Sequence, residues 1–203
     1  MKKQFHTIQS SNKNEFDERI NRLLELGCEL MDGSYEIINN ENGIVYSQVI
    51  IAKNCRIGFY DSGDLQIYFP LNNEGKRNGL CTWYYENGQI SSEGSFKDGK
   101  QNGLFIGYYL NGKKKSERTV IDGKINGLWI QYYENGQKKN EEPWEDDRGI
   151  QNGLYTAWWE NGKKKAELYY KDGYCIESYH WNSFGMPSDG DFHAPYSRYP
   201  MRI

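Results

Sequence analysis

Apolar and polar positions recur through the middle of the chain with a period of about 24 residues, which is typical of a repeat array. Several patterns mark the units. The triplet Asn-Gly-Leu occurs at 78–80, 102–104, 126–128 and 152–154. Two aromatic residues followed by any residue and Asn-Gly occur at 84–88, 108–112, 132–136 and 158–162. Asp-Gly occurs at 98–99, 122–123 and 172–173, and a glutamate column comprises Glu93, Glu117, Glu141 and Glu167.

Each unit is predicted to form one β-hairpin. The Asn-Gly that follows the paired aromatics is a strong hairpin signal because both residues tolerate positive φ. Asp-Gly-Lys supplies the return turn. The segments between the turns, such as 80–85 and 90–96, have strand length. We therefore expect an all-β fold, an elongated antiparallel sheet of tandem hairpins in which each unit adds about 10 Å.

The repeats become irregular at both ends, as capping units do. Residues 60–63 and 41–43 are predicted as degenerate turns before the array, and 181–185 as a last turn after it. In the third unit, Asp147-Arg148-Gly149 replaces Asp-Gly because two residues are inserted. We therefore divide the chain into an N-terminal region with a helix and capping strands at 1–50, an array at 51–185 and an irregular tail at 186–203.

One short helix is predicted at about 12–26, before the array. Asn12 with Glu15 resembles a capping box, and Gly27 suits the stop. Phe16, Ile20, Leu23 and Leu24 follow the i, i+4, i+7, i+8 spacing of one apolar stripe. Such a helix would cover part of the sheet or its first edge.

Composition narrows the class of protein. Of 203 residues, 37% are hydrophobic, 15% are aromatic and 22 are glycine, a balance that favours short strands and tight turns over an α/β enzyme. The formal net charge of −3 disfavours a nucleic-acid binder. No apolar run reaches the roughly 18 residues of a membrane span, and the N-terminus has no signal-peptide pattern, so a cytoplasmic protein is expected. Cys28, Cys55, Cys81 and Cys175 are widely spaced and are interpreted as reduced fillers.

The repeated columns resemble MORN repeats. The form Tyr-Tyr-Glu-Asn-Gly-(Gln/Lys)…Asp-Gly-Lys-x-Asn-Gly-Leu is similar to the bacterial variant found in YwqK-type antitoxin proteins, and the resemblance covers about residues 55–185. It implies a hairpin array without enzymatic activity or cofactor, and a protein-binding role of antitoxin or immunity type. Residues 1–50 lie outside this resemblance.

Strand alternation predicts two different faces. One face carries the leucines of Asn-Gly-Leu and is expected to be the more buried. The other is expected to stay open and to bind a protein partner, because one helix cannot cover a long sheet and because Tyr and Trp are common binding residues. The rings predicted to bind are Trp83, Tyr85, Tyr109, Trp129, Tyr133, Tyr155 and Trp159. The alternative is that these rings mainly stack to hold the sheet.

Charged clusters offer further candidate contacts. Lysines follow the turns at Lys113, Lys114, Lys115, Lys138, Lys139, Lys163, Lys164 and Lys165. They could bind anionic lipid, as a peripheral membrane or scaffold module would, or could be solvated turns neutralised by Glu117, Glu141 and Glu167. Glu142, Glu145, Asp146 and Asp147 lie where the period breaks, and Asp146 and Asp147 are predicted partner contacts unless the loop is merely tolerated.

Signals for catalysis or metal binding are weak. Residues 107–114 approach a phosphate-binding loop but lack its Ser/Thr and fall in a hairpin turn. Cys175, His180, Asp189, Asp191 and His193 fit no standard metal spacing. We therefore predict no catalytic, cofactor-binding or metal-binding residues.

Overall fold

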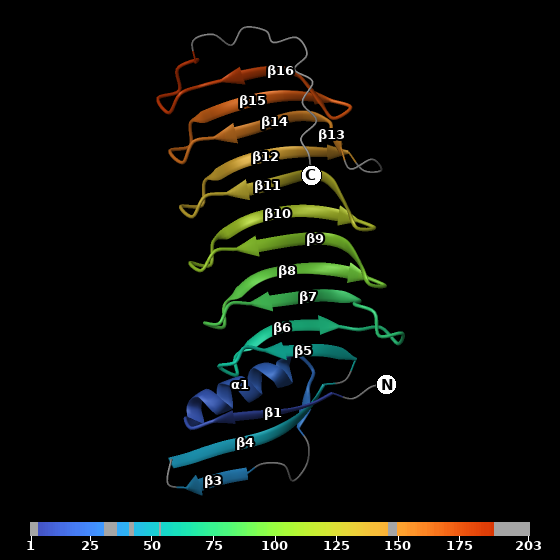
Figure 1. The fold of residues 1–203 in the computed structure, drawn as a ribbon, viewed down its shortest axis with the longest axis vertical. Helices are drawn as coiled ribbons and strands as arrows, with labels where there is room; N and C mark the ends of the chain where they lie inside the picture. The colour runs from blue at the N-terminus through green and yellow to red at the C-terminus, as the bar shows by residue number, and fades with distance from the viewer. Residues whose placement is uncertain (1–3, 31–35, 41–42, 53, 146–149, 189–203) are drawn as a thin grey trace. The chain divides into compact units, whose positions relative to one another are not determined.

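A computed structural model describes residues 4–30, 36–40, 43–52, 54–145 and 150–188. The chain divides into two compact units, Met1–Gln89 and Ile90–Ile203, which are described separately. Both units are built mainly from antiparallel strands, and the described residues contain one α-helix (Figure 1). The predicted fold class, an antiparallel sheet of tandem hairpins with a short N-terminal helix, is confirmed.

The first unit contains a four-stranded sheet, one helix and the first three strands of the hairpin array. Strand β4 (Gly43–Ala52) lies between β1 (Gln4–Ser10) on one side and β2 (Glu29–Leu30) and β3 (Glu36–Asn40) on the other. Strands β5 (Cys55–Phe59), β6 (Leu65–Pro70) and β7 (Gly79–Tyr84) pair in chain order. The turn predicted at 60–63 joins β5 to β6, whereas residues 41–42 of the turn predicted at 41–43 lie outside the described residues.

The predicted helix is present as α1 (Lys13–Glu25), with Asn12 as its N-cap. The Asn12 side chain accepts hydrogen bonds from the backbone N–H groups of Asn14 and Glu15. The capping box is closed through Ser10, whose hydroxyl accepts from the Asn12 N–H and donates to Glu15. Gly27, with φ of 82°, ends the helix as predicted.

The helix packs against strands β1, β5, β6 and β7 of its own unit. Phe16, Ile20 and Leu23 of α1 join Ile8, Cys28, Cys55, Ile57, Leu65 and Tyr84 in a single hydrophobic core. Arg22 extends this contact, because its guanidinium lies 4.3 Å from the Tyr84 ring centroid and donates to the Gly88 carbonyl. The helix therefore covers the face that carries Ile57 and Tyr84.

The second unit is an antiparallel sheet in which the strands pair in chain order. Its strands are β8 (Ile90–Lys97), β9 (Lys100–Tyr108), β10 (Lys114–Ile121), β11 (Lys124–Tyr132), β12 (Lys138–Glu145), β13 (Ile150–Gln151), β14 (Gly153–Trp158), β15 (Lys164–Lys171) and β16 (Tyr174–His180). Strand β12 pairs with both β13 and β14, so the insertion interrupts one strand without breaking the sheet. Residues 146–149 of the insertion lie outside the described residues.

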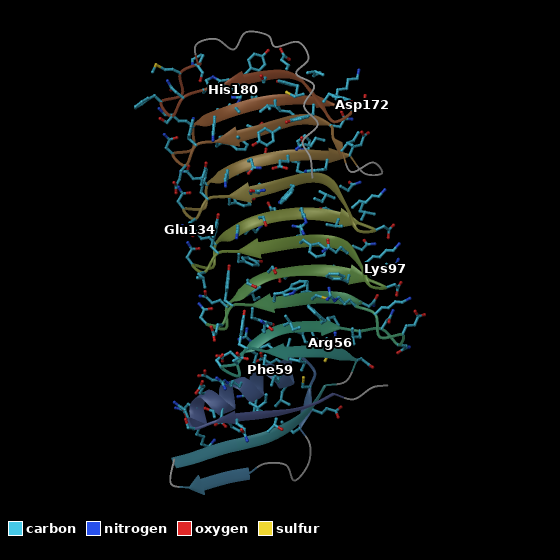
Figure 2. The ribbon with its side chains drawn as sticks, in the orientation of Figure 1. Arg56, Phe59, Lys97, Glu134, Asp172 and His180 are labelled. Carbon is cyan, nitrogen blue, oxygen red and sulfur yellow. The ribbon has the colours of Figure 1, made fainter. Side chains whose placement is uncertain are left out.

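The turns at the two ends of the strands in this sheet are of different types. Figure 2 shows Glu134 at one edge and Lys97 and Asp172 at the other. The Asp-Gly turns are two-residue hairpins in which both residues have positive φ, for example Asp122 at 50° and Gly123 at 87°. In the Tyr133–Gln137 turn only Gly136 has positive φ, and the Asn135 side chain accepts from the Gln137 N–H. These Asn-Gly turns therefore use positive φ at the glycine and not at the asparagine.

Two of the Asn-Gly-Leu triplets, 102–104 and 126–128, lie inside strands β9 and β11, where they form bulges. Arg118 pairs with Trp129 and Val120 with Ile125, so Thr119 faces the three residues 126–128. The same irregularity occurs opposite Ser95. Gly103 and Gly127 have φ of 123° and 86°, a conformation that favours glycine. The bulges account for the triplet in these two units.

Candidate binding surface

The register of the strands in the second unit defines two faces. We call one the aromatic face; its central row runs across neighbouring strands through Gly94, Phe105, Arg118, Trp129, Glu142, Tyr155 and Leu168. We call the other the leucine face. It carries Leu104, Leu128 and Leu154 and a second row through Glu93, Ile106, Glu117, Ile130, Glu141, Thr156 and Glu167.

The expectation that the leucine face is the more buried is wrong in the second unit. Leu104, Leu128 and Leu154 are 49%, 48% and 38% exposed, whereas Phe105 on the aromatic face is 7% exposed. The reason is local packing. A Cβ placed on Gly94 would lie 2.1 Å from the Phe105 ring, so the glycine leaves room for that ring to lie against the backbone there. Large rings beside small residues therefore pack the aromatic face closely.

Rings beside the turns hold one repeat to the next. The Tyr109 hydroxyl donates to the Tyr132 carbonyl at 2.7 Å, and the Tyr133 hydroxyl donates to the Trp158 carbonyl at 2.9 Å. The Trp159 indole N–H donates to the Trp181 carbonyl at 3.0 Å. Tyr60 makes the same contact with the Tyr84 carbonyl in the first unit. Three of the rings predicted to bind a partner thus also have a structural role.

The asparagines of the turns form a second set of links between repeats. The side-chain amides of Asn111, Asn135 and Asn161 donate to the carbonyls of Glu134, Glu160 and Ser183, respectively. The last acceptor belongs to the turn predicted at 181–185, which is confirmed by the hydrogen bond from the Asn182 N–H to the Met186 carbonyl. Both the aromatic and the Asn columns are therefore explained by the stacking of hairpins.

The lysines of the turns contact the protein itself. Lys113 and Lys163 donate to carbonyls of the following turn. The Nζ atom of Lys165 lies 4.6 Å from the centroid of the Trp159 ring, and that of Lys115 lies 5.7 Å from that of Tyr109.

One lysine of each cluster pairs with a glutamate. Lys114, Lys138 and Lys164 form ion pairs with Glu117, Glu141 and Glu167, and these three lysine side chains remain about half exposed. The neutralising glutamates predicted from the sequence are confirmed. Hydrogen bonds from Lys114 and Tyr132, joined by the charge of Lys138, hold the pKa of Glu117 below its ordinary value.

At the centre of the aromatic face, the Arg118 cation lies between two aromatic rings. The guanidinium carbon of Arg118 lies 5.5 Å from the Phe105 ring centroid and 5.7 Å from that of Trp129. Arg118 and Trp129 are half-buried. None of the residues described here accepts a hydrogen bond from Arg118 or forms an ion pair with it. Loss of water around the guanidinium lowers its pKa.

Glu142 continues this row on the far side of Trp129. Burial raises the pKa of its carboxyl group, although hydrogen-bond donors nearby, including the Asn140 side chain at 2.6 Å, oppose the shift. Glu145 accepts from the Asn152 side chain at 2.8 Å. Asp146 and Asp147, the other predicted contacts of the insertion, lie outside the described residues. Arg118 and Glu142 were not singled out together by the sequence, because only the strand register brings them into one row.

The remaining predicted rings occupy different surroundings. Tyr155 is half-buried in the central row, and burial raises the pKa of its hydroxyl. Trp83 belongs to the first unit and makes an edge-to-face contact with Phe69, with 5.2 Å between ring centroids. Tyr85 is also in the first unit and opens the turn that Gly88 closes. These two rings therefore do not belong to the row around Arg118.

Groups suited to metal binding or catalysis are sparse in the described part of the chain. No cluster of three or more His, Cys, Asp or Glu residues there could hold a metal ion. Cys28, Cys55 and Cys81 are buried free thiols, and Cys175 is half-buried. Asp189, Asp191 and His193 lie outside the described residues. The segment 107–114 forms the end of β9 and a turn, where no helix follows to bind phosphate.

The first unit also contains an open groove of about 800 Å³ at its β5–β6 edge. It is lined by Arg56, Phe69, Arg77 and the turn at 71–75. The guanidinium of Arg77 lies 4.2 Å from the Phe69 ring centroid. Because Arg77 already interacts with other groups of the protein, the groove is a weaker candidate for a binding site than the row around Arg118.

The matched family agrees with these repeats. Residues 77–98, 101–122, 125–146 and 151–172 match the family described as MORN repeat variant. The centre of the chain therefore contains four segments that match this repeat, and such repeats are found in repeat-type binding proteins. No curated protein matches the chain. Among the residues described by the structure, no helix is long and apolar enough to span a membrane.

Solved structures show only a distant likeness. TarM of S. aureus is 14% identical with a TM-score of 0.27, over 76% of this chain and 24% of TarM. Accessory secretory protein 1, 2 and 3 of Streptococcus pneumoniae is 18% identical with a TM-score of 0.21, over 56% of this chain and 19% of the other. This chain thus spans about a quarter or less of their length, and the likeness carries no functional argument.

Proposed function

We propose that this protein is a non-catalytic binding protein of antitoxin or immunity type, which neutralises a protein partner by covering part of its surface. The observation that carries the proposal is the central row of the aromatic face. Arg118, Trp129 and Tyr155 are half-buried on one sheet face, and no second layer packs on that sheet among the described residues of its unit. Arg, Trp and Tyr are the residue types enriched in the energetic centres of protein interfaces.

The leucine face is a weaker candidate, although its leucines are more exposed. Leucine is under-represented among such energetic centres, and three glutamates of that face, Glu117, Glu141 and Glu167, are already paired with lysines. These ion pairs, together with the hydrogen bonds from Lys113 and Lys163 to backbone carbonyls, weaken the case for anionic lipid, because the lysines would have to give up partners within the protein.

The test is co-expression with the product of the neighbouring gene. A toxic product should stop growth alone, and this chain should restore growth and co-purify with it. Trp129→Ala should weaken both rescue and co-purification, whereas Leu128→Ser on the leucine face should not. The antitoxin role would be contradicted if no neighbouring product is toxic, and the protein-binding role if no stable complex forms with any protein of the source cell.

A further inference from the structure

On the aromatic face, the column that directly follows the constant glutamates varies from repeat to repeat within this chain. The glutamate at Glu93, Glu117, Glu141 and Glu167 is constant, but the next residue is Gly94, Arg118, Glu142 or Leu168. Constant columns are explained by turns, bulges and links between hairpins. The variable column has no such shared role, yet all its members lie in one row of the sheet. This column therefore distinguishes the four units from one another.

Arg118 is the cation of that column. Its neighbours restrict its side chain but accept no hydrogen bond from it among the described residues. Its guanidinium lies within 6 Å of the centroids of two rings, Phe105 on β9 and Trp129 on β11. Contacts of this kind restrict a long side chain and leave the N–H donors at the rim of the guanidinium plane. Within the described ranges no acceptor is bound to those donors.

Because none of the described residues accepts from it, the N–H donors of Arg118 are left to water, and an acceptor on a ligand can replace that water. We propose that Arg118, held between Phe105 and Trp129, binds the carboxylate of an Asp or Glu side chain presented by the protein partner. The planar guanidinium matches a carboxylate through two parallel hydrogen bonds, and removal of water strengthens that pair. The inference rests on the proposed protein-binding function and adds the chemistry of the contact.

The row around Arg118 favours a carboxylate over a phosphate group. Glu142 lies two strands further along the row, about 10 Å from Arg118 at ordinary strand spacing. Its negative charge opposes a dianion more than a monoanion. No second cation belongs to the row through Phe105, Arg118, Trp129, Glu142 and Tyr155. A partner that places one acidic side chain against Arg118 therefore fits the local charge.

The experiment uses the full chain and a displayed library of random peptides. The best peptide is then synthesised, and its affinity is measured by fluorescence polarisation. We expect an Asp or Glu in the selected peptides whose change to Asn or Gln weakens binding about tenfold, as loss of a charged, paired hydrogen bond does. Arg118→Gln should weaken binding by about the same factor, and the two changes together should cost little more than either alone.

Matched variants separate this contact from general charge and from misfolding. Lys100→Gln removes one positive charge from an exposed end of β9 and should change affinity less than about twofold, the scale of a rim charge. Arg118→Lys keeps the charge without the planar fork and should weaken binding by about threefold or more. If Arg118→Gln does not fold, as judged by circular dichroism, the affinities of Arg118→Lys for the selected acidic peptide and for its Asn or Gln variant decide the question.

Several outcomes would overturn the inference. Selected peptides could lack acidic residues, or the losses from peptide and protein could multiply as independent effects. A peptide with phosphoserine in place of the acid could bind more tightly through Arg118, which would assign the site to phosphate. Binding that ignores Arg118 defeats only this inference, whereas failure to bind any peptide, joined with no partner from the cell, defeats the protein-binding function too.

Discussion

The Tyr109 hydroxyl donates to the Tyr132 carbonyl at 2.7 Å and so ties one hairpin to the next. The two residues belong to adjacent repeats, and the acceptor is the first aromatic of the following pair. A repeat array is stabilised mainly by contacts between neighbouring units. Bonds of this kind therefore determine how well the sheet around Arg118 is held.

Removing this hydroxyl should lower stability without changing the fold. Tyr109→Phe leaves the Tyr132 carbonyl without its donor, at an expected cost of about 1 kcal/mol in the free energy of unfolding. Urea denaturation followed by circular dichroism measures it. Tyr174→Phe is the matched control, because the Tyr174 ring is 57% exposed in the same unit. Equal stability of the two variants would show that the bond contributes nothing.

Gly94 should be intolerant of even a methyl group. A Cβ at that position would lie 2.1 Å from the Phe105 ring, so Gly94→Ala should destabilise the second unit by about 1–3 kcal/mol through overpacking. Thermal denaturation provides the measurement. Combining Gly94→Ala with Phe105→Leu should cost less than the sum of the two single changes, because the smaller side chain relieves the clash. Strict additivity would contradict the proposed packing.

Local chemistry made most elements predictable, whereas burial depended on packing between strands. Asn12 and Gly27 identified the helix ends, and the turn columns identified the hairpins, because capping and positive φ are properties of short segments. The relative burial of the two faces was predicted wrongly, since nothing local shows that Gly94 makes room for the Phe105 ring. The row joining Arg118 to Trp129 depends on register and bulges, which the repeat spacing alone does not fix.

Acid should weaken the second unit partly through Glu117. Hydrogen bonds from Lys114 and Tyr132 keep its pKa below the ordinary 4.5 in the folded protein. A group with a depressed folded pKa stabilises the fold above its unfolded pKa, and this contribution is lost as the pH falls through the folded value. Glu117→Gln should therefore flatten the loss of stability between about pH 5 and pH 3.

Urea midpoints across that range measure the effect. Glu134→Gln, a change at an exposed turn, should leave the slope as in the unaltered protein. An unchanged slope in Glu117→Gln would mean that other carboxylates control acid unfolding.

The two faces of the second unit should respond differently to substitution when a partner binds. Trp129→Ala removes a ring that contacts Arg118, so it should weaken the complex by about tenfold or more, as loss of an interface centre does. Leu104→Ser and Leu128→Ser alter leucines that are 49% and 48% exposed and should change affinity by less than about twofold if the leucine face is free. Calorimetric titration of the complex measures both effects, and circular dichroism confirms that each variant is folded. The reverse pattern, in which the leucine variants lose binding and Trp129→Ala keeps it, would transfer the partner to the leucine face and leave Arg118 as an unpaired cation with a purely structural role.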